Sequence, residues 1–136
     1  MRIVLDTNAL LVSLPASSKY HPVFQAFVHK RYTLFISNDI YLEYLEIITQ
    51  KASPIVAESF IELLFRQQNI EVVDIYYQWN LITADADDNK FSDCAIAAKA
   101  DYLVTNDAHF NVLKNLGFPK INIITLQEFL TLVESL

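Results

Sequence analysis

The sequence has little cysteine, little glycine and no long apolar run, and each of these absences excludes a class of protein. Cys94 is the only cysteine among 136 residues, so the chain can form no internal disulfide and no thiolate cluster for zinc. Gly117 is the only glycine, which excludes the glycine-rich loops that bring backbone N–H groups to a nucleotide phosphate. Any phosphate chemistry must therefore use side chains or a metal ion.

No apolar stretch approaches the roughly 18–20 residues that a membrane span requires, and no basic segment followed by an apolar run marks a signal peptide. We therefore expect a soluble, cytoplasmic protein. With 53% hydrophobic and 19% charged residues, the composition is that of one globular domain, residues 1–136, with a hydrophobic core.

Positive charge is also scarce, because 16 acidic residues outnumber 10 lysines and arginines and give a formal net charge of −6. This balance disfavours tight, sequence-independent binding of nucleic acid, which depends on a surplus of lysine and arginine over phosphate. The objection weakens if several of the acids are metal ligands, since bound divalent ions reverse the local field.

Short apolar runs alternate with longer segments of helical period, a pattern that predicts an α/β fold in which helices cover a parallel sheet. The predicted strands are residues 3–5, 34–36, 70–73, 102–104 and 121–124. The predicted helices are approximately residues 20–30, 39–50, 54–68, 90–99, 109–116 and 125–134.

Local signals support three of the helix boundaries. Ser53 followed by Pro54 is typical of an N-cap and a first helical residue. Thr125 and Glu128 have the spacing of a capping box. Gly117 suits the end of the helix before the final strand.

Two acids follow the ends of predicted strands. Asp6 comes directly after the first strand, and Asp107 follows the fourth. Ligands of open α/β sheets bind outside the carboxyl ends of the strands, where the strand order reverses. If the two strands are neighbours there, Asp6 and Asp107 face one cleft.

Further acids lie on or beside predicted helices. Glu43 falls at the border of the face that Ile40, Tyr44 and Ile48 mark as buried, and a half-buried glutamate without a partner is costly. Four acids occupy residues 85–93, just before or within a helix, and we expect two of them, Asp88 and Asp93, to face the cleft.

Such converging carboxylates repel one another. At about 4 Å and an effective dielectric constant near 20, each pair costs on the order of 4 kcal/mol. Without a cation, some of the carboxylates should therefore become protonated. A ligand set of oxygens, without a cysteine cluster or a histidine pair, suits Mg²⁺ or Mn²⁺ better than zinc.

Four motifs together resemble those of the PIN-domain family, and the resemblance spans nearly the whole chain. They are Leu5-Asp6-Thr7-Asn8, Ser37 to Glu43, Asp87-Asp88-Asn89-Lys90-Phe91, and Asp101 to Asp107. The resemblance implies a three-layer α/β/α sandwich with a central parallel sheet of about five strands. It also implies a Mg²⁺- or Mn²⁺-dependent ribonuclease specific for single-stranded RNA, as in the VapC-like toxins of toxin–antitoxin pairs.

By position, the resemblance assigns the catalytic and metal-binding acids and their supporting residues. The acidic quartet is Asp6, Glu43, Asp88 and Asp107, and the supporting polar residues are Thr7, Asn8 and Thr105. Asp93 also resembles the third acid in other branches of the family. We favour Asp88 because its 19-residue separation from Asp107 resembles the usual spacing. The family further implies a cognate antitoxin and a homodimer, for which helices 39–50 and 54–68 are candidate interfaces.

Other interpretations remain open from the sequence. Each acid has a structural alternative, as a turn residue, a solvated helix residue or, for Asp107, a helix cap. The chain could be a catalytically silent PIN-like module that acts through protein contacts. It could also be a phosphatase or phosphoacceptor domain with Asp6 as nucleophile, but the dehalogenase-like pattern needs a second aspartate where this chain has Asn8.

Overall fold

The structure, a computed structural model, describes residues 1–136 and contains a five-stranded sheet in which all pairings are parallel. The strand order is β3-β2-β1-β4-β5, so the order reverses between β1 and β4. The strands are β1 (Arg2–Leu5), β2 (Thr33–Ile36), β3 (Ile70–Val72), β4 (Tyr102–Val104) and β5 (Ile123–Ile124). The predicted parallel sheet is confirmed, and β1 and β4 are neighbours as the site hypothesis requires.

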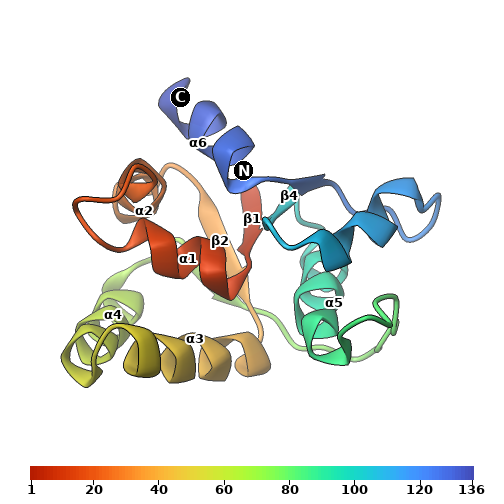
Figure 1. Ribbon diagram of the computed structural model, residues 1–136, viewed down its shortest axis with the longest axis horizontal. Helices are drawn as coiled ribbons and strands as arrows, with labels where there is room; N and C mark the ends of the chain where they lie inside the picture. Colours follow the sequence, from red (N-terminus) through yellow and green to blue (C-terminus); the bar gives the residue numbers. More distant parts are fainter.

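Helices cover both faces of this sheet, which confirms the predicted sandwich. Figure 1 shows α1 to α4 on one side of the strands, and α5 with the segment that follows β4 on the other. The helices are α1 (Thr7–Ser13), α2 (His21–Val28), α3 (Asn38–Lys51), α4 (Pro54–Arg66), α5 (Asn89–Ala98) and α6 (Leu126–Glu134), with 3-10 segments η1 (Ala86–Asp88) and η2 (Ala108–Asn115).

Three elements differ from the prediction. Helix α1, which starts directly after Asp6, was not predicted, because seven residues are too few to show a helical period. The segment predicted as a helix at 109–116 is the 3-10 segment η2, and the last strand is limited to Ile123–Ile124.

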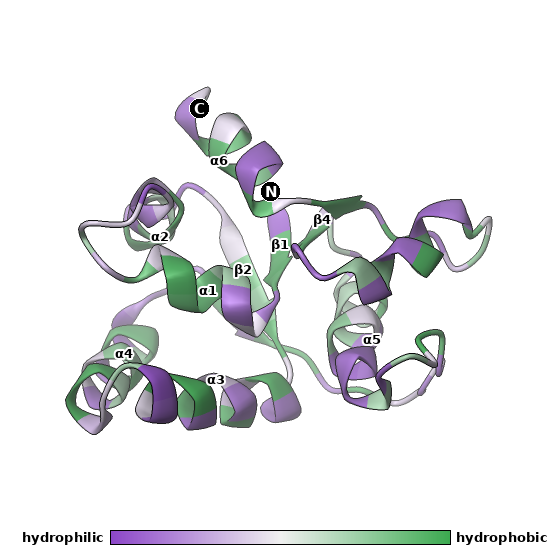
Figure 2. Cartoon of the chain, viewed as in Figure 1, coloured by the Kyte–Doolittle hydropathy of each residue, from purple (hydrophilic) through white to green (hydrophobic).

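The core lies between the sheet and the helices. Figure 2 shows strands that are mostly hydrophobic toward their carboxyl ends, whereas α3 alternates hydrophobic and hydrophilic bands. The predicted inner face of α3 is confirmed, since Ile40, Tyr44 and Ile48 are fully buried. Tyr44 also donates a hydrogen bond from its hydroxyl to the carbonyl of Leu5, which ties α3 to the end of β1.

Two of the predicted helix caps are confirmed by hydrogen bonds. The Ser53 hydroxyl accepts from the backbone N–H of Val56, and Thr125 and Glu128 form the complete capping box of α6. No helix in the structure combines the length and the apolar character needed to cross a membrane.

Candidate metal centre

The parallel register of β1 and β4 places the first acid. Leu5 pairs with Val104, and the N–H of Asp6 donates to the carbonyl of Val104 at 3.0 Å. The Thr105 hydroxyl then donates to Asp6 Oδ2 at 2.7 Å and accepts from the N–H of Asp107 at 3.0 Å. Thr105 therefore fixes both strand-end acids, which the sequence could place only approximately.

Asp6 is an acid that folding makes difficult to ionise. Its residue surface is only 8% exposed. Its pKa is raised from an ordinary value of 3.8 to about 6, mainly by burial and also by the charges of Asp88 and Glu43, whereas hydrogen bonds from Thr105 and Thr7 oppose the shift. Asp6 caps the start of α1 without a side-chain capping bond, so its carboxylate is available to the centre.

Glu43 approaches the centre from α3, and both of its oxygens are engaged. The Thr7 hydroxyl donates to Oε2, and the Lys90 ammonium lies 2.9 Å from Oε1. Lys90 also lies 3.1 Å from Asp87. Desolvation lowers the pKa of Lys90, but its hydrogen bonds to Glu43 and Asp87 outweigh this effect and raise the pKa overall, so the ammonium remains charged.

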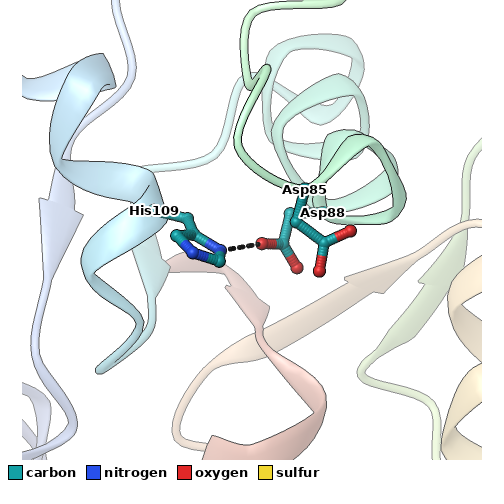
Figure 3. Close-up of side chains that lie close together, drawn as sticks. All are labelled: Asp85, Asp88 and His109. Carbon is teal, nitrogen blue, oxygen red and sulfur yellow. Dashed lines mark hydrogen bonds and ion pairs between the residues drawn. The ribbon is translucent and has the colours of Figure 1, made fainter.

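Asp88 enters the centre at the start of α5, where it pairs with a histidine. His109 Nδ1 lies 3.2 Å from Asp88 Oδ2, and Figure 3 shows the ring facing this carboxylate, with Asp85 beside it. One ligand atom from each of Asp85, Asp88 and His109 lies within 4.8 Å of the others. Burial raises the pKa of Asp88 despite this hydrogen bond, and the bond to Asp88 with the charge of Asp107 raises the pKa of His109.

Asp107 caps a 3-10 segment and also lines the cleft beside Asp6. Its Oδ1 caps η2 by accepting from the N–H of His109 at 2.9 Å. Its side chain also lines a cleft of about 250 Å³ together with Asp6, Asn8 and Asn106. Helix capping therefore does not remove Asp107 from the centre.

Asp93, a predicted metal ligand, has its contacts outside the group of Asp6, Asp88 and Asp107. Its Oδ1 accepts from the backbone N–H of Trp79 at 3.1 Å, and its side chain lines a different, polar cavity of about 320 Å³. Burial raises its pKa, and the bond from Trp79 opposes the shift. Asp88 is the N-cap residue of α5, whereas Asp93 lies within the helix. The two aspartates therefore have different surroundings, contrary to the expectation that both face one cleft, and the choice of Asp88 as the metal ligand stays a prediction.

Three residues of the centre were missed or undervalued from the sequence. His109 is outside the predicted ligand set and lies beside Asp88. Asn89 exchanges two hydrogen bonds of 2.9 Å with the backbone of Ile82 and donates to Ala86, which holds the acidic segment in place. Lys90 is outside the predicted acidic quartet and pairs with Glu43. The roles of His109 and Lys90 depend on contacts between residues distant in sequence, and that of Asn89 depends on the geometry of the irregular segment before α5.

The donor set fits a divalent cation. Three acids from separate elements, Asp6, Glu43 and Asp88, are close enough for the charges of two to raise the pKa of the third. No lysine or arginine forms an ion pair with Asp6, Asp88 or Asp107, and the only basic side chain beside them is His109, which lies 3.2 Å from Asp88 and 3.5 Å from Asp107. Oxygen ligands with one accessible imidazole suit Mg²⁺ or Mn²⁺, and the nitrogen favours Mn²⁺.

A family model described as PIN domain matches residues 2–109 of the chain. The chain belongs to the PIN-domain family. The matched residues of this PIN domain include all four acids of the predicted quartet, from Asp6 to Asp107. No curated protein matches it in sequence.

Two solved structures share the fold of this PIN domain. VapBC2 from Rickettsia felis, bound to a DNA fragment from its promoter, is 18% identical with a TM-score of 0.62, and the match covers 92% of this chain and 98% of that one. The PIN domain of human SMG5 is 14% identical with a TM-score of 0.58, over 97% of this chain and 98% of that one. At these identities the similarity concerns the fold alone.

The raised pKa of Asp6 gives a pH-dependent prediction for the metal-free PIN domain. An acid whose pKa is raised by folding stabilises the protein fully below its unfolded pKa of 3.8, and this stability is lost as the pH rises through about 6. In EDTA, Asp6→Asn should therefore raise the free energy of unfolding at pH 7.5 by on the order of 2 kcal/mol, and by almost nothing at pH 4. Urea denaturation at both pH values measures this difference.

Asp74→Asn, at an exposed loop position, is the matched control and should change stability little at either pH. A destabilised Asp6→Asn protein at pH 7.5, or a gain that is the same at both pH values, would show that Asp6 is not electrostatically strained.

Proposed function

We propose that the chain is a metal-dependent endoribonuclease that hydrolyses phosphodiester bonds of single-stranded RNA. The observation that supports this most is the convergence of Asp6, Glu43, Asp88 and Asp107 at the point where the strand order reverses. The hydrogen bonds of Thr105 and Thr7 orient two of these acids, and Asp6 has a pKa of about 6. PIN domains are generally nucleases, and here all four acids are present.

The chemistry we propose needs no side-chain nucleophile. A divalent ion at this centre would bind a non-bridging phosphate oxygen, lower the pKa of water and neutralise developing charge. Asp6, Asp88 and Asp107 would hold it, with Thr105 keeping Asp6 and Asp107 in register. Asn8 and Asn106 line the same cleft and offer amide groups to the RNA backbone.

A pair of aspartate variants tests this proposal and the choice between Asp88 and Asp93. With Mn²⁺ and single-stranded RNA, Asp88→Asn should reduce the cleavage rate by at least about 100-fold, because it removes a proposed ligand. Asp93→Asn should stay near the wild-type rate, since the amide oxygen can still accept from Trp79. Asp6→Asn provides the inactive reference, and gel analysis of labelled RNA measures all three.

The opposite pattern, with Asp93→Asn inactive and Asp88→Asn active, would reject this ligand assignment. If the wild type and Asp6→Asn cleave equally, or neither cleaves, the nuclease proposal fails and the silent interaction module becomes the better explanation.

We further propose that the nuclease is the toxin of a toxin–antitoxin pair, restrained by a cognate antitoxin. The fold shared with VapBC2 supports this branch of the family. Induced expression of the chain alone should arrest the growth of bacterial cells, because uncontrolled RNA cleavage stops protein synthesis. Asp6→Asn expressed to the same level should not. Normal growth with an active wild-type enzyme would contradict the toxin role.

A homodimer through α3 and α4 is proposed on the basis of exposed apolar side chains. Leu42 on α3 and Ile55 and Phe65 on α4 are 60%, 75% and 81% exposed, and large apolar side chains exposed on two packed helices are candidate interface residues. In sedimentation equilibrium we expect the wild type to have twice the monomer mass, and Phe65→Asp to shift toward monomer because it places charge in the interface. A monomeric wild type would reject the proposal.

A further inference from the structure

Lys90 is the only lysine or arginine that forms an ion pair with an acid of the centre. Its side chain is 17% exposed, and that of Glu43 is 18% exposed. Because both side chains are largely covered, water solvates neither the ammonium nor the carboxylate well. Each charge is therefore stabilised mainly by the other. The pair is thus a fixed part of the centre and not a solvated surface bridge.

The contacts divide the acids into two groups. Glu43 has both carboxylate oxygens occupied, one by the ammonium of Lys90 and the other by the hydroxyl of Thr7. Asp6 and Asp88 have no lysine or arginine partner. The permanent positive charge of a lysine is therefore present at Glu43, whereas Asp6 has no basic partner and Asp88 has only the imidazole of His109.

This asymmetry affects how many divalent ions the centre can take. In two-metal sites the ions lie about 3.5–4 Å apart and share carboxylates between them. A second ion at Glu43 would share a carboxylate oxygen with the ammonium of Lys90 or the hydroxyl of Thr7, and the ammonium would repel that ion. The positive charge that a second ion would bring to Glu43 is already provided by the ammonium of Lys90.

We propose that Lys90 acts as a resident cation in place of a second metal ion, so that the centre takes one divalent ion, on the side of Asp6, Asp88 and Asp107. The proposal rests on the metal-dependent function proposed above, and concerns the metal count and not the reaction. Lys90 is in this sense a positioning residue, which holds Glu43 and limits the occupancy of the centre.

Titration of the full chain with Mn²⁺, without RNA, tests the count. Isothermal titration calorimetry gives the number of ions bound, and electron paramagnetic resonance distinguishes an isolated Mn²⁺ from a spin-coupled pair. We expect one isolated Mn²⁺ in the wild type and two in Lys90→Gln. Glutamine removes the charge but retains an N–H donor for Glu43, so the variant should fold, and circular dichroism verifies this.

Two further variants separate charge from structure. Lys90→Arg retains the cation and should return the count to one. Lys99→Met removes an exposed lysine at the end of the same helix and should also bind one ion. A Lys90→Met protein tests the same loss of charge without any donor, and should bind two ions as Lys90→Gln does.

Two Mn²⁺ ions in the wild type, or one in both Lys90→Gln and Lys90→Met, would overturn the proposal. Failure of the nuclease function gives a different result: one Mn²⁺ in the wild type, two in Lys90→Gln, and no cleavage of RNA by either. A wild type that binds no Mn²⁺ would reject both proposals together.

Discussion

The pairing of β1 with β4 is the constraint on which the rest of the centre depends. The two strands are far apart in sequence, and their parallel register brings Asp6 and Thr105 to the same edge of the sheet. The hydrogen bond between them then sets the position of Asp107 as well. The strand order reverses between β1 and β4, so the segments that follow these two strands lead to opposite faces of the sheet. A cleft remains between the two segments.

The sequence predicted the parts of the fold that local patterns determine. Short apolar runs in the sequence show where the strands end. Asp6 and Asp107 could therefore be placed at one edge of the sheet once β1 and β4 were taken as neighbours. The inner face of α3 follows from helical period, which placed Glu43 at its border. The cap residues of α4 and α6 could also be predicted, because capping depends on residues close in sequence.

What the sequence did not predict depends on contacts between distant and irregular segments. The direction of Asp93 is set by its bond to Trp79, in a loop without periodic pattern. The pairing of Asp88 with His109 requires the 3-10 segment η2 to pass close to the start of α5. No spacing rule predicts either contact, because each joins residues whose separation depends on loop geometry and not on helical or strand period.

The distribution of charge within the centre bears on how a protein of net charge −6 could accept the proposed RNA substrate. Glu43 is paired with Lys90, so the unbalanced charge is concentrated at the aspartates around the cleft. Asp6 alone has its pKa raised to about 6, which means that near neutral pH the metal-free fold retains electrostatic strain. A cation that binds the folded state relieves this strain and stabilises the fold by mass action. Under the proposed function, the same cation would reverse the local field that otherwise repels phosphate, so one set of carboxylates would couple metal binding to the access of RNA.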